Sequence, residues 1–212
     1  MAALDPATIA VLALAVLFLA WYYAGFAYNR KLARRLANEL KTAVLAFGGT
    51  SRAQWYGTTA FKMMTEGANP PFREVSLTVT LRPREMPINW AIGAAQGRRD
   101  TVLVEAALRK DPGTHFEVVD PQSRVGRRRL RAKSGWSSIT QGDRSLQLSA
   151  DSERKATRIL DELGPDALGP IMALHVTSGS QPGLAASLAV DVDSVKSAIE
   201  GIRSLANRLA AQ

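Results

Sequence analysis

The segment 121–142 is the part of the chain whose residue types most directly suggest chemistry. Six basic residues fall within ten positions of it, and no acidic residue is interspersed. Each phosphate that an arginine or lysine neutralises releases counterions, and a nearby tryptophan can stack on a base or lie among lipid headgroups. We therefore expect this segment to bind an anionic partner, either RNA or phospholipid; a solvated loop that only aids solubility is the alternative. The candidate residues are Arg124, Arg127, Arg128, Arg129, Arg131, Lys133 and Trp136.

Outside that segment, the residue types that carry catalysis form no recognisable pattern. His115 and His175 each lie in a predicted strand among apolar residues, without the spacing of a metal-binding pair, and the chain has no cysteine. The glycines of residues 48–50 and 93–97 could cradle a phosphate, but neither stretch has a nucleotide-binding fingerprint. We interpret the histidines as half-buried strand positions and the glycines as turns. The sequence thus predicts that the protein has no catalytic residue, no metal site and no cofactor. We therefore expect that it is not an enzyme.

Residues 7–27 form a stretch without a charged side chain, followed by Tyr28 and flanked by Asp5 and Arg30. As a helix this stretch is roughly 31 Å long, which is enough to cross the hydrocarbon core of a bilayer. Aromatic residues gather at its C-terminal end, where they prefer the headgroup region. We predict a transmembrane helix over residues 7–28. A buried core helix and a signal peptide cleaved after Ala27 are the alternatives.

Four basic residues follow this stretch and predict its orientation. Basic residues remain on the cytoplasmic side, which places residues 1–6 outside as a short extracytoplasmic N-terminus and the rest of the chain in the cytosol. The membrane would be the cell membrane in a prokaryote and the endoplasmic reticulum in a eukaryote. Topology alone explains these charges, although anionic lipid would also attract them. The four membrane-proximal residues are Arg30, Lys31, Arg34 and Arg35.

Hydrophobic periodicity predicts an α+β fold for the remainder. An amphipathic helix over residues 29–50 continues the transmembrane helix and ends at Gly48. One cytosolic domain follows over residues 51–212, with a mainly antiparallel sheet, and the basic segment 121–142 is a loop or a poorly ordered hairpin within it. A helical turn is expected at 88–95, and helices at 152–163 and from Asp191 or Asp193 to 209. Strands are expected at 54–64, 73–82, 101–108, 115–119, 144–150, 171–176 and 184–190.

The order of these features resembles the calumin family, the coiled-coil-domain-containing membrane proteins of the multipass translocon. The apolar stretch is followed by Asn-Arg-Lys-Leu-Ala-Arg-Arg-Leu at 29–36, and the helix ends before an aromatic strand with Trp-Tyr-Gly at 55–57. A strand, a Gly-Ser loop and a final helix close the chain, over residues 171–209. The resemblance is one of pattern and spans roughly residues 10–210.

The resemblance implies a single-pass protein whose cytosolic domain lies beside the Sec translocon, contacts the ribosome and its RNA, and serves an intramembrane chaperone complex. This sequence lacks the family's acidic luminal region and its long Lys/Glu-rich tail. Calcium binding is therefore not expected, and ribosome contact through that tail is put in doubt. We expect a membrane-anchored accessory factor in membrane-protein biogenesis. A membrane-tethered enzyme or signalling domain with an unrecognised site is the alternative.

Overall fold

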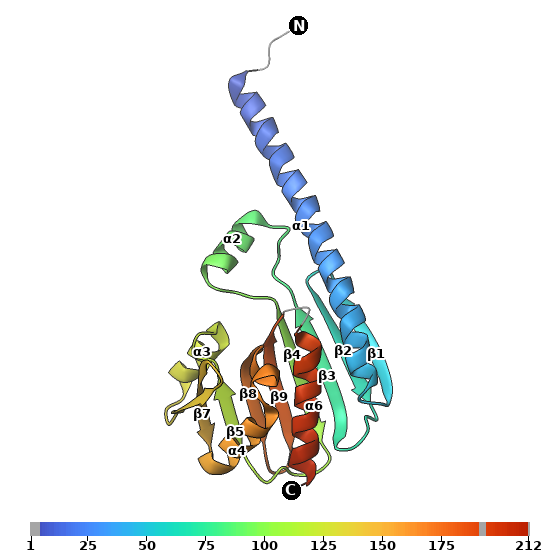
Figure 1. Ribbon diagram of the computed structural model, residues 1–212. Coiled ribbons are helices and arrows are strands. Elements are labelled where there is room, and N and C mark those ends of the chain that lie inside the picture. Colours follow the sequence, from blue (N-terminus) through green and yellow to red (C-terminus); the bar gives the residue numbers. More distant parts are fainter. Residues whose placement is uncertain (1–4, 191–193, 212) are drawn as a thin grey trace.

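The structure is a computed structural model that describes residues 5–190 and 194–211. It is an α+β fold in which a long N-terminal helix projects from a domain built on one sheet (Figure 1). The helices are α1 (Pro6–Leu45), α2 (Pro87–Ala95), α3 (Arg124–Ala132), α4 (Glu153–Leu163), α5 (Pro165–Leu168) and α6 (Val195–Ala211). The strands are β1 (Thr50–Tyr56), β2 (Ala60–Glu66), β3 (Phe72–Thr80), β4 (Thr101–Leu108), β5 (Phe116–Val119), β6 (Ser137–Gln141), β7 (Arg144–Ala150), β8 (Ile171–Thr177) and β9 (Gly183–Ala189).

Within the described residues, nine strands form one antiparallel sheet in the order β1-β2-β3-β4-β9-β8-β5-β7-β6. Apolar and polar residues alternate along β4. Because successive side chains of a strand point to opposite faces, one face of β4 is more apolar than the other. Val102 and Val104 are buried on one face, whereas Leu103 is partly exposed on the other. The mainly antiparallel sheet expected from the sequence is confirmed.

Helices cover one face of the sheet and bury the hydrophobic core against it. Figure 1 shows α6 and the lower half of α1 side by side on this face, and α4 and α5 pack against α6. The lower half of α1 buries Ala33, Leu36, Leu40, Ala43 and Val44. Their spacing of three and four residues is that of a helix with one apolar face, as the sequence predicted.

The first part of α1, over residues 6–20, is exposed along its whole length. Among the described residues it is the one helix long and apolar enough to cross a membrane, and the apolar window is unburied. A helix that packed in a soluble core would be largely buried there. The chain therefore presents an apolar helix of membrane-spanning length that continues without a break into the helix that packs on the sheet (Figure 1).

Several predicted elements have different bounds in the structure, among them the helix predicted over residues 29–50, which ends at Leu45, so that Thr50 begins β1. The predicted strand at 54–64 is two strands, because Gly57 has φ 72° and allows a tight turn between β1 and β2. The predicted strand at 115–119 begins at Phe116, so His115 precedes β5. The two aspartates expected to cap the last helix lie outside the described residues.

The basic segment 121–142 is neither a loop nor a disordered hairpin, which corrects the sequence prediction. It folds into α3 and the edge strand β6. Ser123 caps α3, its Oγ accepting a hydrogen bond from the Gly126 amide at 2.8 Å. Arginine is itself a good helix former, and the helix was missed because it has almost no apolar periodicity. Gly126 is required for packing, since a Cβ there would overlap the Asp120 carbonyl.

Candidate anion-binding surface and the joint with α1

Helix formation aligns four of the predicted basic residues on one face of α3. They occur at spacings of three, four and seven residues, which places side chains on the same side of a helix. All four are exposed. We call them the arginine stripe: Arg124, Arg127, Arg128 and Arg131. In a loop, these side chains would have no common direction. The helix orients all four of them to the same side.

Arg129 points to the sheet instead. Its Nε lies 3.5 Å from Oε1 of Glu117, whose side chain is only 8% exposed. Glu117 is opposite His175 in the β5–β8 pairing, and His175 alternates with the core residues Leu174 and Val176. The Arg129–Glu117 ion pair therefore attaches α3 to the face of the sheet opposite the core helices. Neutralising a buried carboxylate is a structural role, distinct from that of the stripe.

The last two predicted residues contact each other. The Lys133 ammonium lies 5.7 Å from the centre of the Trp136 ring, and the Trp136 Nε1–H donates to the Lys133 carbonyl at 2.8 Å. Trp136 is half-buried in this arrangement. It lies just after the C-terminal end of α3, with Lys133 over one face of its ring.

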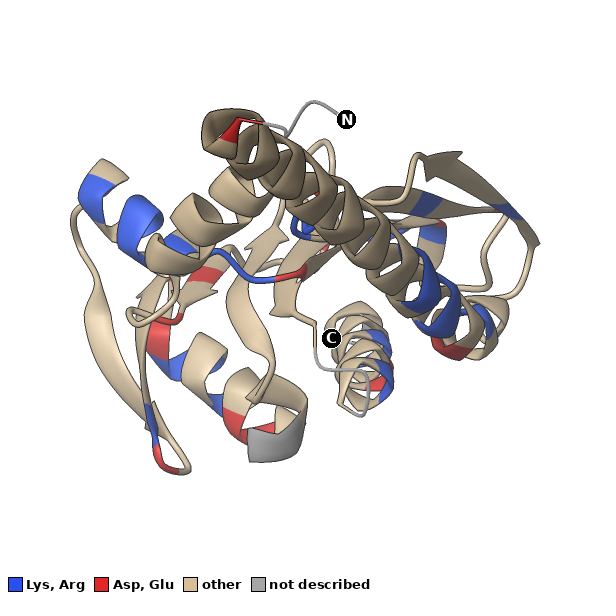
Figure 2. Cartoon of the chain, turned by 90° about the horizontal axis from the view of Figure 1, so that it is seen from above, with Lys and Arg blue, Asp and Glu red and all other residues tan. Residues whose placement is uncertain are grey.

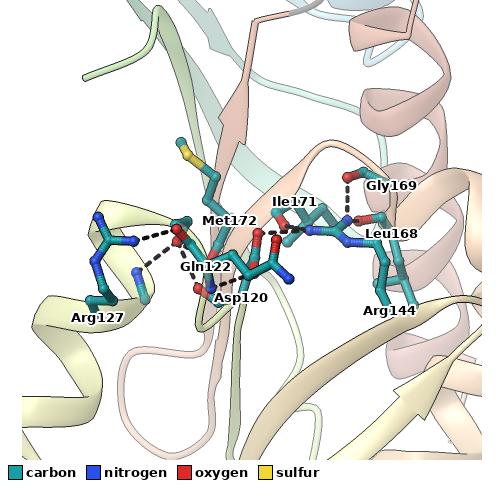
Figure 3. A network of polar contacts seen from close by, with 10 residues as sticks. Asp120, Gln122, Arg127, Arg144, Leu168, Gly169, Ile171 and Met172 are labelled. Atoms are coloured by element: carbon teal, nitrogen blue, oxygen red, sulfur yellow. Dashed lines mark hydrogen bonds and ion pairs between the residues drawn. The ribbon is translucent and has the colours of Figure 1, made fainter. Parts of the chain in front are cut away.

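Asp120 and Arg144 hold the beginning of α3 in place (Figure 3). Arg144 donates to the Asp120 carboxylate at 2.9 Å and to the carbonyls of Leu168 and Gly169, just before β8. The second Asp120 oxygen accepts from the Gln122 amide at 2.8 Å. Arg144 is thus neutralised within the fold. The sequence analysis missed this pair, because its partners are 24 residues apart and no local pattern marks them.

A cavity of about 650 Å³ opens beside the stripe, at the end of the sheet from which the apolar part of α1 projects. Arg98 and Arg99, from the segment after α2, line it together with Arg124 and Arg127. Arg124 also donates to the Gln96 side chain at 3.1 Å, which links the two segments. Arg98 and Arg99 follow the glycine turn predicted at 93–97, and the fold brings them beside the predicted basic residues Arg124 and Arg127.

A second unpredicted feature is a joint between α1 and the loop after β3. Trp21 Nε1 donates to the Arg84 carbonyl at 2.9 Å, and a Cβ on Gly25 would overlap that same carbonyl. The Asn29 amide donates to the Arg82 carbonyl and to the Glu85 carboxylate, both at 2.9 Å. This joint fixes α1 against the domain at the C-terminal end of its apolar stretch.

The four membrane-proximal basic residues predicted at 30–35 lie on α1 just below this joint and are exposed. Figure 2 shows their blue ribbon on α1, well separated from the blue ribbon of α3 across the molecule. The structure therefore keeps the two basic groups apart. It does not unite them into one surface.

The two histidines lie together, with ring centres 5.1 Å apart in an edge-to-face arrangement. Burial lowers the pKa of His175, and the positive charges of Arg129 and Lys133 act in the same direction, while Glu117 opposes them. Within the described part of the chain no three His, Cys, Asp or Glu side chains gather as metal ligands.

No family model matches this sequence, and no curated protein matches it. The interpretation of the site therefore rests on its residues and their geometry.

Proposed function

We propose that this chain is a non-enzymatic, single-pass accessory factor in membrane-protein biogenesis, anchored by α1 with its N-terminus outside and its domain in the cytosol. The unburied apolar half of α1 and the basic residues directly after it support this orientation. The joint argues against cleavage after Ala27, because removing that segment would strip Trp21 and Gly25 from the Arg84 loop.

The arginine stripe carries the proposal that this factor binds ribosomal RNA. Four exposed guanidinium groups on one face of a rigid helix can contact successive phosphates, and each contact contributes through counterion release. No acidic residue occurs in α3 to neutralise them from within the helix. Figure 2 shows α3 displaced to one side of α1, where a ribosome bound to a neighbouring translocon could reach it.

The arginine-lined cavity favours one other function. Its volume of about 650 Å³ is within the range of small-molecule sites, and the arginines that line it would suit a phosphorylated ligand. A membrane-tethered signalling or enzymatic domain is therefore the second candidate. It predicts saturable binding of a small phosphorylated molecule by the parent chain, without recovery of ribosomes.

A pull-down of the full chain from detergent-solubilised membranes tests the first function. We expect ribosomes and translocon subunits to be recovered with the parent chain, and ribosomes to be absent when Arg127, Arg128 and Arg131 are all changed to Ala. The matched control removes three exposed charges from the helices on the opposite face, through Arg154→Ala, Arg158→Ala and Lys196→Ala. Recovery of neither ribosomes nor translocon subunits with the parent chain would contradict the proposal.

A further inference from the structure

Helix α2 exposes apolar side chains that the domain does not cover. Met86 is 52% exposed, Ile88 66% and Ile92 50%. No charged residue occurs between Glu85 and Arg98. Exposed apolar surface of this kind usually marks a contact with a protein or a membrane, because its exposure to water is unfavourable.

The position of α2 identifies the contact as the membrane. The Trp90 ring packs on the Trp21 ring of α1, with centroids 5.6 Å apart. Trp21 precedes the end of the apolar stretch at Ala27 by six residues, or about 9 Å of helix. If α1 spans the bilayer with the whole apolar stretch immersed, the contact with Trp21 places α2 about 9 Å below the surface of the hydrocarbon core. Interfacial helices bury their apolar face to a similar depth, about 5–10 Å into the headgroup and acyl boundary.

The joint transmits this depth to α2. Arg84, in the loop that leads to α2, donates to Asn29 at 2.9 Å and forms an ion pair with Asp100 at 2.5 Å, after α2. Both ends of the segment that contains α2 are thus fixed to each other and to α1. Consequently α2 cannot withdraw from the membrane without breaking buried polar contacts.

The charges that follow α2 complement anionic lipid headgroups. Arg98 and Arg99 come directly after the helix, are exposed, and line the cavity at this end of the sheet. A headgroup phosphate beside them would lie at the level where an interfacial helix ends and the cytosol begins. Apolar residues followed by arginines therefore match the order of acyl chains and phosphates in the leaflet.

We infer that α2 is a second membrane contact: an interfacial helix whose Met86, Ile88 and Ile92 enter the acyl boundary, while Arg98 and Arg99 bind phosphates of anionic phospholipids. The inference rests on the proposed membrane anchor. It adds a second contact with the membrane, which a single transmembrane helix does not require. It fixes the tilt of the domain relative to the bilayer, so that the arginine stripe is presented in one direction.

Depth-dependent quenching of the full chain in nanodiscs tests this contact. The chain has no cysteine, so single cysteines can carry a fluorophore without background labelling. Ile92→Cys reports on α2, Leu14→Cys on the apolar stretch of α1, and Leu103→Cys on the sheet face opposite the core helices. The discs contain anionic phosphatidylglycerol in phosphatidylcholine, with a nitroxide near either the headgroup end or the methyl end of the acyl chain.

We expect the label at Ile92 to be quenched roughly twofold more by the shallow nitroxide than by the deep one. The label at Leu14 should show the opposite preference, and the label at Leu103 should be quenched by neither. Quenching at Leu14 without quenching at Ile92 would overturn the second contact and leave the anchor intact. Absence of quenching at both positions would remove the anchor, and the inference with it.

The role of the arginines is tested by lipid composition. In discs of neutral phosphatidylcholine alone, we expect less quenching at Ile92 than in anionic discs, because the insertion equilibrium shifts about fivefold for each arginine that no longer binds an anionic headgroup. Arg98→Ala with Arg99→Ala should abolish this difference, whereas Arg154→Ala with Arg158→Ala should preserve it. An equal response of both double variants to lipid charge would overturn phosphate binding by Arg98 and Arg99.

Discussion

Asn29 and Arg84 are joined by a hydrogen bond of 2.9 Å, from the Arg84 guanidinium to the side-chain carbonyl of Asn29. Asn29 is fully buried, although it stands at the end of an otherwise apolar stretch. Arg84 also contacts Asp100, and its guanidinium lies 5.0 Å from the centre of the Tyr28 ring. These contacts make the apolar helix and the sheet domain one mechanical unit, because the polar groups at their boundary satisfy one another.

Replacing Asn29 should loosen this unit. Asn29→Ala removes the hydrogen bonds of this buried side chain with Arg84, Glu85 and the Arg82 carbonyl, which costs about 1–3 kcal/mol. For a chain of this size, in which each kcal/mol shifts the unfolding temperature by about 2–4 °C, we expect that temperature to fall by about 2–12 °C in detergent. Asn38→Ala is the matched control, since Asn38 is an exposed asparagine on the same helix. Equal melting temperatures for Asn29→Ala and the parent would show that the joint does not stabilise the fold.

Protease accessibility tests the orientation. The basic residues at 30–35 predict that residues 30–212 are cytosolic. Protease added to intact spheroplasts should therefore spare the domain, and the same protease should degrade it after lysis. Degradation before lysis, with a cytosolic marker protein intact, would reverse the topology and exclude contact with cytosolic ribosomes.

The lowered pKa of His175 predicts a loss of stability in mild acid. Burial favours the neutral imidazole in the folded state, with Arg129, Lys133 and His115 adding to the effect and Glu117 opposing it. Because the unfolded chain binds the proton more readily, with a pKa of about 6.5, stability is present above that pH and declines as the pH falls through the folded pKa. Thermal unfolding between about pH 7 and pH 5 should show this decline.

His175→Gln removes the titrating group and should flatten that part of the profile. His115→Gln is the control, since it removes the neighbouring ring and retains His175 itself. An unchanged pH dependence in His175→Gln would assign the acid sensitivity to other groups.

Strands with strict alternation could be predicted from the sequence, because each residue of such a strand indicates which face it occupies. The strand predicted at 101–108 has these bounds in β4, and the one predicted at 73–82 is β3, at Phe72–Thr80. The continuation of the apolar helix into an amphipathic one was predicted for the same reason. Helix α3 was not, since its order lies in a cap at Ser123 and a glycine contact at Gly126. Neither leaves an apolar period in the sequence.

Some features of the candidate site could likewise be predicted from the sequence, and others could not. Its charges were visible as composition, but the separate role of Arg129 depends on Glu117, which belongs to another element. The joint and the position of α2 depend on pairs such as Trp21 and Arg84, which are 63 residues apart. Such pairs become neighbours only when the sheet places the loop after β3 beside α1.

The central claim is that the arginine stripe binds ribosomal RNA, and the salt dependence of ribosome binding tests it most directly. Full-length chain in nanodiscs is titrated with ribosomes at several salt concentrations. With four stripe arginines on phosphates, the slope of log affinity against log salt should be roughly −3. The triple variant Arg127→Ala, Arg128→Ala and Arg131→Ala should flatten it by about two units, because each phosphate contact on single-stranded nucleic acid contributes about 0.7.

The control variant Arg154→Ala, Arg158→Ala and Lys196→Ala should retain the parent slope. Anionic liposomes without protein are added as a competitor, because headgroups attract the same charges. The account predicts that ribosome binding survives this competitor and that the slope depends on the stripe. An identical slope for the parent and the stripe variant would contradict it. Displacement of the ribosomes by the liposomes would also contradict it.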